Sequence, residues 1–242
     1  MNAIETLRLT RRFGSLTAVD SLDLCIPEGE CFALLGVNGA GKTTAIRMLC
    51  GLLTPTEGDA LMMGKSIVNA PGEAKAFLNL SPQETAVAPN LTVRENLEFI
   101  AGIYGMKNAR QAAEGMIEKL SLGEVADRRA GKLSGGWQRR LSIAMALITG
   151  PRILFLDEPT LGLDVLARRE LWQVIRDLKG TTTLVLTTHY LEEAEALADR
   201  IGIMAHGRLK AVGTARELMD AAGANCFEDA FIALAAGKEA VL

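Results

Sequence analysis

Between two apolar runs the sequence reads Gly36-Val37-Asn38-Gly39-Ala40-Gly41-Lys42-Thr43-Thr44. The run before it, residues 31–35, has the length of a buried strand, and the run after it, residues 45–49, reads as a helix. The glycines let successive backbone N–H groups turn toward an anion, because no Cβ obstructs the turn. The stretch therefore predicts a strand, a phosphate-binding loop and a helix. The alternative is an ordinary glycine-rich turn between the same two elements.

We name residues 36–44 the phosphate loop, because they contain the complete pattern Gly-x-x-x-x-Gly-Lys-Thr of nucleotide-binding proteins. In such a loop Lys42 reaches the terminal phosphates, and the Thr43 hydroxyl ligates a magnesium ion. The positive end of the helix dipole adds to the attraction. The predicted nucleotide-binding residues of the loop are Gly36, Asn38, Gly39, Ala40, Gly41, Lys42, Thr43 and Thr44.

The composition is that of an ordinary globular chain: 242 residues, 49% hydrophobic and 23% charged, can bury a substantial core. A formal net charge of −3 lacks the basic character typical of nucleic-acid binding, so we expect no nucleic-acid partner. Residues 1–12 are polar, and no window approaches the roughly 18 uninterrupted apolar residues of a membrane-spanning helix. We therefore expect a cytoplasmic protein, for which a partner would supply any membrane span.

The four cysteines, Cys25, Cys31, Cys50 and Cys226, lack the CxxC spacing of metal or redox sites. Because three of them fall inside apolar segments, we expect buried, reduced thiols. His206 lies in a predicted turn, and the sequence assigns it no role.

Strand and helix signals alternate along most of the chain, which is typical of a doubly wound parallel sheet flanked by helices. Between residues 84 and 150 the signals are helical, with a capping box at Thr92 and amphipathic runs at residues 111–120 and 135–148. We therefore predict an α/β P-loop NTPase core, with a mostly parallel sheet and an antiparallel β portion, and an inserted α-helical subdomain. The predicted strands are residues 4–9, 22–26, 31–35, 59–63, 77–80, 153–156, 182–187, and the hairpin 201–204 and 208–212.

Further helices are predicted at residues 164–179, 191–198 and 227–236, and after a capping box at Thr214. We expect residues 1–242 to form one domain. Its predicted parts are a nucleotide-binding core of residues 1–83 and 151–220, a helical subdomain of residues 84–150, and a C-terminal helical tail of residues 221–242.

The apolar strand predicted at residues 153–156 ends in two carboxylates, Asp157 and Glu158. Ligand sites of parallel sheets lie at the carboxyl ends of strands, where the phosphate loop also lies. Asp157 would hold magnesium there, and Glu158 would act as general base toward an attacking water. Alone, such a pair is more often a solvated turn, but beside a phosphate loop the catalytic interpretation is favoured.

A second glycine-rich stretch, Leu133-Ser134-Gly135-Gly136-Trp137, opens the last helix of the predicted insert. We name it the signature segment. A hydroxyl, two glycines and a helix N-terminus suit an anion, so Ser134, Gly135 and Gly136 are candidates for nucleotide binding. The alternative is that Ser134 is the helix N-cap and the glycines are merely flexible.

In this order along the chain, these motifs resemble those of the nucleotide-binding subunits of ATP-binding-cassette (ABC) transporters, over essentially the whole length. The resemblance implies ATP and Mg²⁺ as ligands. It also implies a head-to-tail dimer, in which the signature segment of one subunit contacts the γ-phosphate held by the other. Phe13 would stack on adenine, and ordinary packing of its ring is the alternative. The implied magnesium ligands are Thr43, Gln83 and Asp157.

Three further positions receive a role from the resemblance. Gln83 matches the glutamine that joins the core to the helical insert and senses magnesium and the γ-phosphate. His189 matches the histidine that bonds the γ-phosphate and orients water, and it completes the expected catalytic set with Glu158, Lys42 and Gln83. Asp164 lies in a stretch that resembles the family's dimer-contacting loop, and it is also an expected helix N-cap.

Four positions depart from the common family pattern: Trp137, Met145, Leu161 and Val165 replace glutamine, arginine, serine and proline. Such variants, together with residues 188–195 and 227–231, resemble the branch that serves ABC-2-type exporters of drugs and polysaccharides.

The resemblance therefore implies an ATP-hydrolysing subunit that powers export through a separate integral-membrane permease, and two copies of it would close on ATP. The permease would hold the subunit on the inner face of the plasma membrane. The predicted permease surface is Gln83 with residues 86–104, and Leu91 and Leu97 are its expected probes.

The alternative is a soluble ABC-type ATPase that acts as a mechanical switch on ribosomes or DNA. Such relatives usually carry tandem cassettes, long coiled coils or basic insertions. A phosphotransferase kinase is disfavoured because it would not need the signature segment. A catalytically silent binding module would lack Glu158 or His189.

Overall fold

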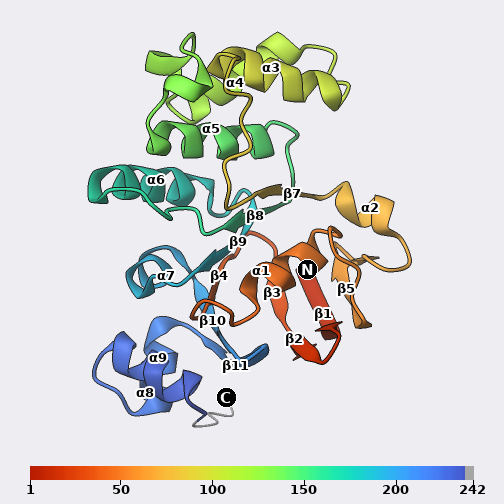
Figure 1. The fold of residues 1–242 in the computed structure, drawn as a ribbon, viewed down its shortest axis with the longest axis vertical. Helices are drawn as coiled ribbons and strands as arrows, with labels where there is room; N and C mark the ends of the chain where they lie inside the picture. The colour runs from red at the N-terminus through yellow and green to blue at the C-terminus, as the bar shows by residue number, and fades with distance from the viewer. Residues whose placement is uncertain (238–242) are drawn as a thin grey trace.

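The computed structural model describes residues 1–237, and Figure 1 shows how their elements are arranged. Three helices lie at one end of the molecule: α3 (Val93–Ile103), α4 (Ala109–Lys119) and α5 (Gly135–Leu147). Two sheets and their helices form the middle, and α8 (Ala215–Ala222) and α9 (Phe227–Ala235) lie at the other end. Residues 238–242 of the expected C-terminal tail lie outside the described residues.

A six-stranded sheet has the order β11-β10-β4-β9-β8-β7. From β10 to β7 all neighbouring strands pair in parallel, and β11 pairs antiparallel with β10. The predicted parallel sheet and its terminal hairpin are therefore confirmed. The strands are β4 (Cys31–Leu35), β7 (Leu78–Ser81), β8 (Ile153–Asp157), β9 (Thr183–Thr188), β10 (Arg200–Ala205) and β11 (Arg208–Gly213).

The central strands β4, β8 and β9 are buried along their whole length, which explains their unbroken apolar sequences. Successive side chains of β4 point to opposite faces of the sheet. Phe32 and Leu34 enter a core with α1 (Lys42–Leu49) and a second, antiparallel sheet. Cys31, Ala33 and Leu35 enter a core with the helices of the other face.

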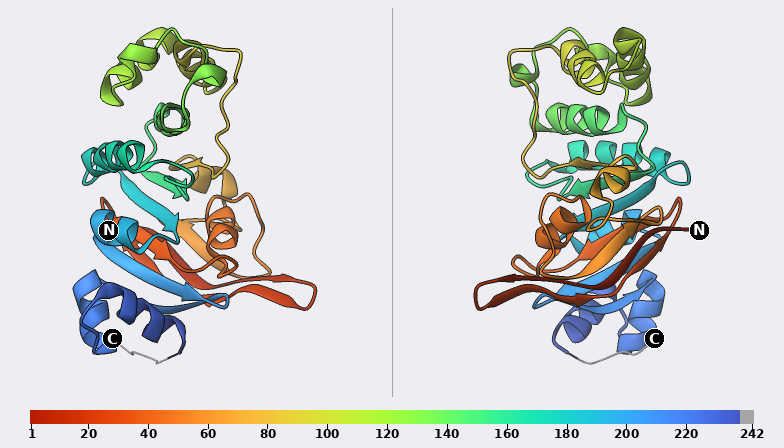
Figure 2. Two further views of the ribbon diagram at one scale, coloured as in Figure 1. Left: turned by 60° about the vertical axis from the view of Figure 1, so that its left-hand side comes forward. Right: turned by 90° about the vertical axis from the view of Figure 1, so that its right-hand side faces the viewer.

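The antiparallel sheet has the order β2-β1-β5-β6, and β3 also pairs with β1. In Figure 2 the β1–β2 hairpin extends outward from the body of the molecule. The strands are β1 (Asn2–Phe13), β2 (Leu16–Leu22), β3 (Cys25–Pro27), β5 (Glu57–Met62) and β6 (Lys65–Ser66).

The predicted single strand at residues 22–26 is wrong, because the chain breaks there between β2 and β3. Leu22, Leu24 and Ile26 are all buried and alternate as they would in one strand. However, the Asp23 carboxylate accepts a hydrogen bond from the backbone N–H of Arg8 at 2.6 Å. This side chain takes up a ladder donor of β1, so the pairing is interrupted.

The helices at the α3–α5 end follow local sequence signals. The capping box of α3 is confirmed, because the Thr92 hydroxyl accepts from the Glu95 backbone and the Glu95 carboxylate accepts from that of Thr92. Val93, Leu97 and Ala101 are buried one turn apart on α3. Two short 3₁₀ turns, Gly123–Val125 and Ala130–Lys132, connect α4 to α5.

The remaining helices are α2 (Pro71–Lys75), α6 (Val165–Leu178) and α7 (Leu191–Leu197). Asp164 is the N-cap of α6 as predicted, and its carboxylate accepts from the backbone N–H groups of Leu166 and Ala167 at 2.9 Å. Within residues 1–237, no helix has both the length and the apolar character needed to span a membrane.

The expectation of four buried thiols is wrong for two of them. Cys31 and Cys50 are buried, whereas Cys25 and Cys226 are exposed, and all four are free. Cys25 faces outward because its neighbour Ile26 takes the inward position on β3. Burial raises the pKa of the Cys31 thiol to about 12, so this group remains neutral and unreactive.

Candidate nucleotide-binding site

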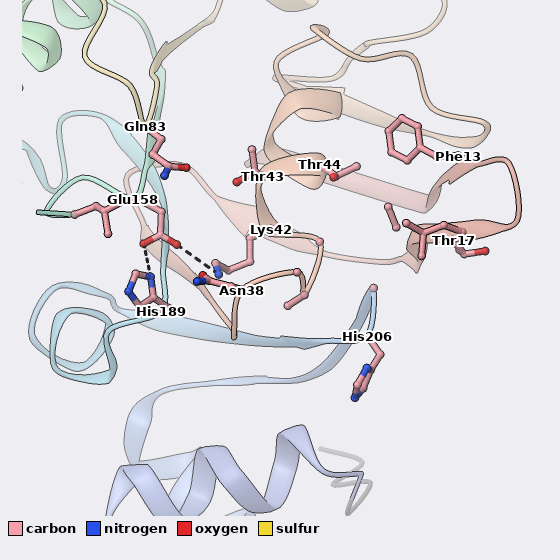
Figure 3. Close-up of a pocket in the computed structure, with 17 residues that line it drawn as sticks. Phe13, Thr17, Asn38, Lys42, Thr43, Thr44, Gln83, Glu158, His189 and His206 are labelled. Carbon is pink, nitrogen blue, oxygen red and sulfur yellow. Dashed lines mark hydrogen bonds and ion pairs between the residues drawn. The ribbon is translucent and has the colours of Figure 1, made fainter.

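A cleft of about 610 Å³ opens where the parallel strands end, and Figure 3 shows the side chains around it. Its walls come from the loops after β4, β7, β8 and β9, from the β1–β2 hairpin and from the β10–β11 turn. This is the edge at which parallel α/β sheets bind ligands. The lining residues are Phe13, Leu16, Thr17, Ala18, residues 38–44, Gln83, Glu158, Leu161, His189, His206 and Gly207.

The phosphate loop needs its glycines for steric reasons. A Cβ on Gly36 would lie 2.3 Å from the carbonyl oxygen of Met204. Gly41 has a φ of +104°, and a Cβ there would lie 2.4 Å from the carbonyl oxygen of Ala18. The loop therefore packs so closely against β2 and β10 that no side chain fits at these two positions.

Lys42 is buried at the start of α1, and its side chain folds back over the phosphate loop. The ammonium Nζ donates to the carbonyl oxygens of Gly36 at 2.7 Å and Val37 at 3.3 Å. It also lies 3.5 Å from Oε1 of Glu158. Lys42 is thus the cation that would meet phosphate oxygens bound by the loop.

Thr43 and Asp157 meet at the base of the cleft, where the Thr43 hydroxyl donates to Oδ1 of Asp157 at 3.3 Å. Thr187 donates to the same oxygen at 2.6 Å and so fixes the carboxylate. Among residues 1–237, no group of three or more His, Cys, Asp or Glu side chains could hold a metal by itself. Magnesium commonly takes one or two carboxylates together with water and substrate phosphates. A hydroxyl and a carboxylate beside a phosphate loop fit this requirement.

Glu158 lies between the phosphate loop and His189, as the dashed contacts in Figure 3 show. Its Oε2 is 2.9 Å from Nδ1 of His189. The backbone φ of Glu158 is 49°, in the left-handed region that strains a residue with a Cβ. Its backbone N–H donates to the hydroxyl and carbonyl oxygens of Thr187 at 3.0 and 3.2 Å. The strained backbone turns the carboxylate toward Lys42 and His189.

The structure does not bring the signature segment to this cleft. Ser134 and Gly136 line a separate cavity of about 40 Å³ between α5 and α6. The helix α5 packs on one face of the parallel sheet, whereas α1 and the phosphate loop pack on the other. Ser134 occupies the N-cap position of α5, but within the described chain its hydroxyl makes no capping hydrogen bond.

Phe13 lies at the end of β1, on the wall of the cleft. Its ring is 46% exposed, so it does not pack in the core. The guanidinium carbon of Arg11 lies 4.6 Å from the ring centroid. An exposed aromatic ring on the wall of the cleft is available to stack on a flat ligand.

Sequence reasoning missed three residues at or behind the cleft. His206 lines the cleft although its position in a turn gave it no role. Arg139 and Glu193 are buried behind the cleft, at 4% and 0% exposure. Their positions on amphipathic helices carry no signal that distinguishes them from surface charges, since their burial depends on how the helices pack.

Glu193 is a buried carboxyl on α7, and its Oε1 accepts a hydrogen bond from Nε1 of Trp172 on α6 at 3.1 Å. Burial raises the pKa of Glu193 above its usual 4.5, and the nearby charge of Glu158 acts in the same direction. The hydrogen bond from Trp172 partly opposes this rise.

The raised pKa of Glu193 predicts a pH-dependent stability. Between about pH 4.5 and the higher folded-state pKa, the folded chain binds this proton more tightly than the unfolded chain, so stability falls as pH rises. Glu193→Gln removes the titration. We therefore expect the Tm of this variant, relative to the Tm of the wild type, to rise as pH increases. Thermal unfolding from about pH 5 to pH 8 measures the difference. The exposed Glu195→Gln on the same helix is the control, and a pH-independent difference for Glu193→Gln would contradict the prediction.

A sequence profile of the ABC transporter family matches residues 19–161, which is more than half of the chain. The chain belongs to the ABC transporter family. The matched region of this ABC chain includes the phosphate loop, the signature segment and the two carboxylates Asp157 and Glu158 at the end of β8. The family resemblance of the motifs is confirmed.

Curated relatives agree with this assignment. The daunorubicin/doxorubicin resistance ATP-binding protein DrrA of Streptomyces peucetius is 42% identical over 226 residues, covering 92% of this chain and 68% of DrrA. The probable multidrug ABC transporter ATP-binding protein YbhF of Escherichia coli K12 is 42% identical over 219 residues, covering 89% of this chain and 38% of YbhF. ABC transporter A family member 7 of Arabidopsis thaliana is 45% identical over 205 residues, covering 83% of this chain and 22% of that protein. The chain therefore spans about a fifth to two thirds of these relatives.

A solved structure of an ATP-binding subunit of an ABC transporter superposes with a TM-score of 0.84 at 26% identity. The match covers 96% of this chain and 99% of the other. The predicted fold class is confirmed. This ABC chain therefore has a P-loop NTPase core.

Proposed function

We propose that this ABC chain is an ATP-hydrolysing subunit that powers export through a separate membrane permease. The position of Glu158 carries the proposal, because its carboxylate lies 3.5 Å from Lys42 Nζ and 2.9 Å from His189 Nδ1. One carboxylate thus links the cation that would hold the terminal phosphates to the imidazole that would orient water. The names of DrrA and YbhF, a drug-resistance protein and a probable multidrug protein, support export as the direction.

Each residue of the cleft has a role in the proposed reaction. Backbone N–H groups of the phosphate loop and the Lys42 ammonium hold the β- and γ-phosphates of ATP. Glu158 accepts a proton from the water that attacks the γ-phosphorus, and His189 holds this water in line. A magnesium ion on Thr43, Asp157 and Gln83 would neutralise charge on the phosphate oxygens. Phe13 stacks on the adenine ring.

The proposed active state is a dimer of two copies. The signature segment lies apart from the phosphate loop of its own chain, in a different cavity. In a head-to-tail pair, Ser134, Gly135 and Gly136 of one copy complete the site of the other. Asp164, at the exposed start of α6, contacts the partner copy.

Measuring ATP hydrolysis directly tests the proposal that this chain is an ATPase. The purified chain should release inorganic phosphate from ATP with Mg²⁺ present, and the release should stop when EDTA removes the ion. Absence of turnover in a folded, ATP-binding preparation would refute the proposal.

The proposed permease surface is the α3 end of the molecule, which would hold the chain at the inner face of the plasma membrane. Phe99 and Ile103, four residues apart on one face of α3, are 56% and 62% exposed, and Tyr104, which follows the helix as its C-cap, is 59% exposed. The sequence-based choice of Leu97 as a probe is wrong, because this side chain is fully buried. Leu97→Ala would open a cavity and cost about 2–5 kcal/mol of stability instead.

We therefore expect Phe99→Asp to abolish binding to the permease while basal ATP hydrolysis stays within about twofold of wild type. A charge on this apolar patch would be desolvated in the interface, which costs several kcal/mol. The measurement is co-purification of a polytopic membrane protein with the tagged chain from membranes of its natural host. Ile232→Asp, also exposed at 58% but on α9 at the opposite end, is the matched control.

Retention of the membrane protein by Phe99→Asp would contradict the surface assignment. Co-purification of the wild type with ribosomes or DNA, and with no membrane protein, would instead favour the soluble mechanical ATPase. The net charge of −3 argues against that outcome.

A further inference from the structure

Arg139 lies on α5 shortly after the signature segment, and its side chain points into the protein behind the nucleotide cleft. It is 4% exposed. The next residue, Arg140, is 12% exposed and instead contacts the side chains of Glu170 and Trp137. Burying an arginine is costly unless every donor is satisfied, so its contacts must account for all five N–H groups.

Five backbone carbonyl oxygens accept from the five N–H groups of Arg139. Nε donates to Pro159 at 2.8 Å. Nη2 donates to Asp157 at 2.6 Å and Glu158 at 2.9 Å. Nη1 donates to Gln83 at 3.1 Å and to Pro82. All five donors of the guanidinium are therefore satisfied, and its partners lie at the last residue of β8 and in the loops that follow β7 and β8.

These two loops carry the residues expected to touch magnesium, water and the γ-phosphate. Glu158 has the strained φ of 49°, which persists only when its surroundings hold it. Its N–H is fixed by Thr187, and its carbonyl oxygen is fixed by Arg139. Arg139 also donates to the carbonyl oxygens of Asp157 and Pro159, on either side of Glu158. It therefore fixes the backbone of the turn that orients the Glu158 carboxylate.

We propose that Arg139 is a positioning residue for ATP hydrolysis, which clamps the Glu158 and Gln83 loops to the helix that begins at the signature segment. The inference rests on the proposed function, since it acts through Glu158 as general base. All five hydrogen bonds of the Arg139 guanidinium go to main-chain oxygens. Arg139 therefore sets the geometry of the catalytic side chains without touching the nucleotide. A displacement of a catalytic group by about 1 Å can cost a factor of 10² in rate.

Arg139→Lys is the informative variant, because it keeps the positive charge but offers three donors in place of five. We expect kcat per site to fall about 10- to 100-fold while KM changes less than about threefold. Titration with a fluorescent ATP analogue in EDTA counts the folded sites, so that loss of folded protein does not count as loss of rate. Arg110→Lys, the same exchange at an exposed position on α4, should stay within about twofold of wild type in both constants.

A double-mutant cycle separates positioning from a general loss of structure. If Arg139 acts through Glu158, adding Arg139→Lys to Glu158→Gln should lower the residual turnover by less than about twofold. A further tenfold loss in the double variant would overturn the proposal. So would an Arg139→Lys enzyme whose kcat per site equals that of wild type. If instead the wild type shows no Mg²⁺-dependent turnover, the proposed function has failed, which the same assay detects separately.

Discussion

Glu158→Gln is expected to lower ATP turnover by about 10²- to 10⁴-fold, because an amide cannot accept the proton of the attacking water. Its shape matches that of the carboxylate, so ATP should still bind to Lys42 and the phosphate loop. Contacts of the nucleotide to Ser134 and Gly136 of a second copy would persist while hydrolysis stops. We therefore expect an ATP-dependent dimer, measured by light scattering after size-exclusion chromatography in EDTA.

Two additional variants sharpen this test. Glu118→Gln, at an exposed position on α4, should leave turnover unchanged. Adding Ser134→Arg to Glu158→Gln should prevent the dimer, since the new side chain would occupy the place of the partner's phosphate. A Glu158→Gln chain that binds ATP, remains monomeric and turns over ATP at the wild-type rate would contradict both the general base and the shared site.

Lys42→Ala is expected to weaken ATP binding by about 10²-fold or more. Among the described residues that line the cleft, Lys42 is the only lysine or arginine. Charge-assisted hydrogen bonds contribute about 1.5–3 kcal/mol each, and Lys42 would make such bonds to the terminal phosphates. The substitution also leaves Glu158 facing the phosphates without a cation between them, which adds repulsion.

Fluorescence titration with an ATP analogue in EDTA measures this loss without interference from turnover. Lys65→Ala is the control, because Lys65 forms an exposed ion pair with Glu73 at 2.5 Å and lies outside the cleft. Circular dichroism should show that Lys42→Ala remains folded. Unchanged affinity in the folded variant would mean that the phosphates bind elsewhere than the predicted loop.

The secondary structure around the cleft could be predicted because its signals are local. The capping boxes at Thr92 and Thr214 and the N-cap Asp164 lie where the sequence predicts them, since each involves residues within three or four positions. The break at Asp23 could not be predicted, because its partner is the distant backbone N–H of Arg8. Periodicity alone made residues 22–26 look like one strand.

In the candidate site, too, features with local sequence signals could be predicted, whereas features that depend on tertiary packing could not. Thr43, Asp157, Glu158 and His189 could be selected because each follows an apolar strand of a parallel sheet, and such strands end at a common edge. The distances of 3.3 Å from Thr43 to Asp157 and 2.9 Å from Glu158 to His189 support that reasoning. By contrast, Leu97 was a poor choice for a surface probe, since the sequence of an amphipathic helix gives its apolar face but not which neighbours cover it.

The sequence by itself determined the phosphate loop, the strands of the parallel sheet, and the carboxylates at the end of one of them, because glycine patterns, capping and apolar periodicity are encoded over short stretches. Only the tertiary structure decided which partners each charged side chain has. Arg139 and Arg140 are adjacent in the chain, yet one binds five carbonyl oxygens of two distant loops and the other binds the side chains of Glu170 and Trp137. That difference depends on the packing of α5 against the ends of β7 and β8, which brings together backbone oxygens that no local pattern records.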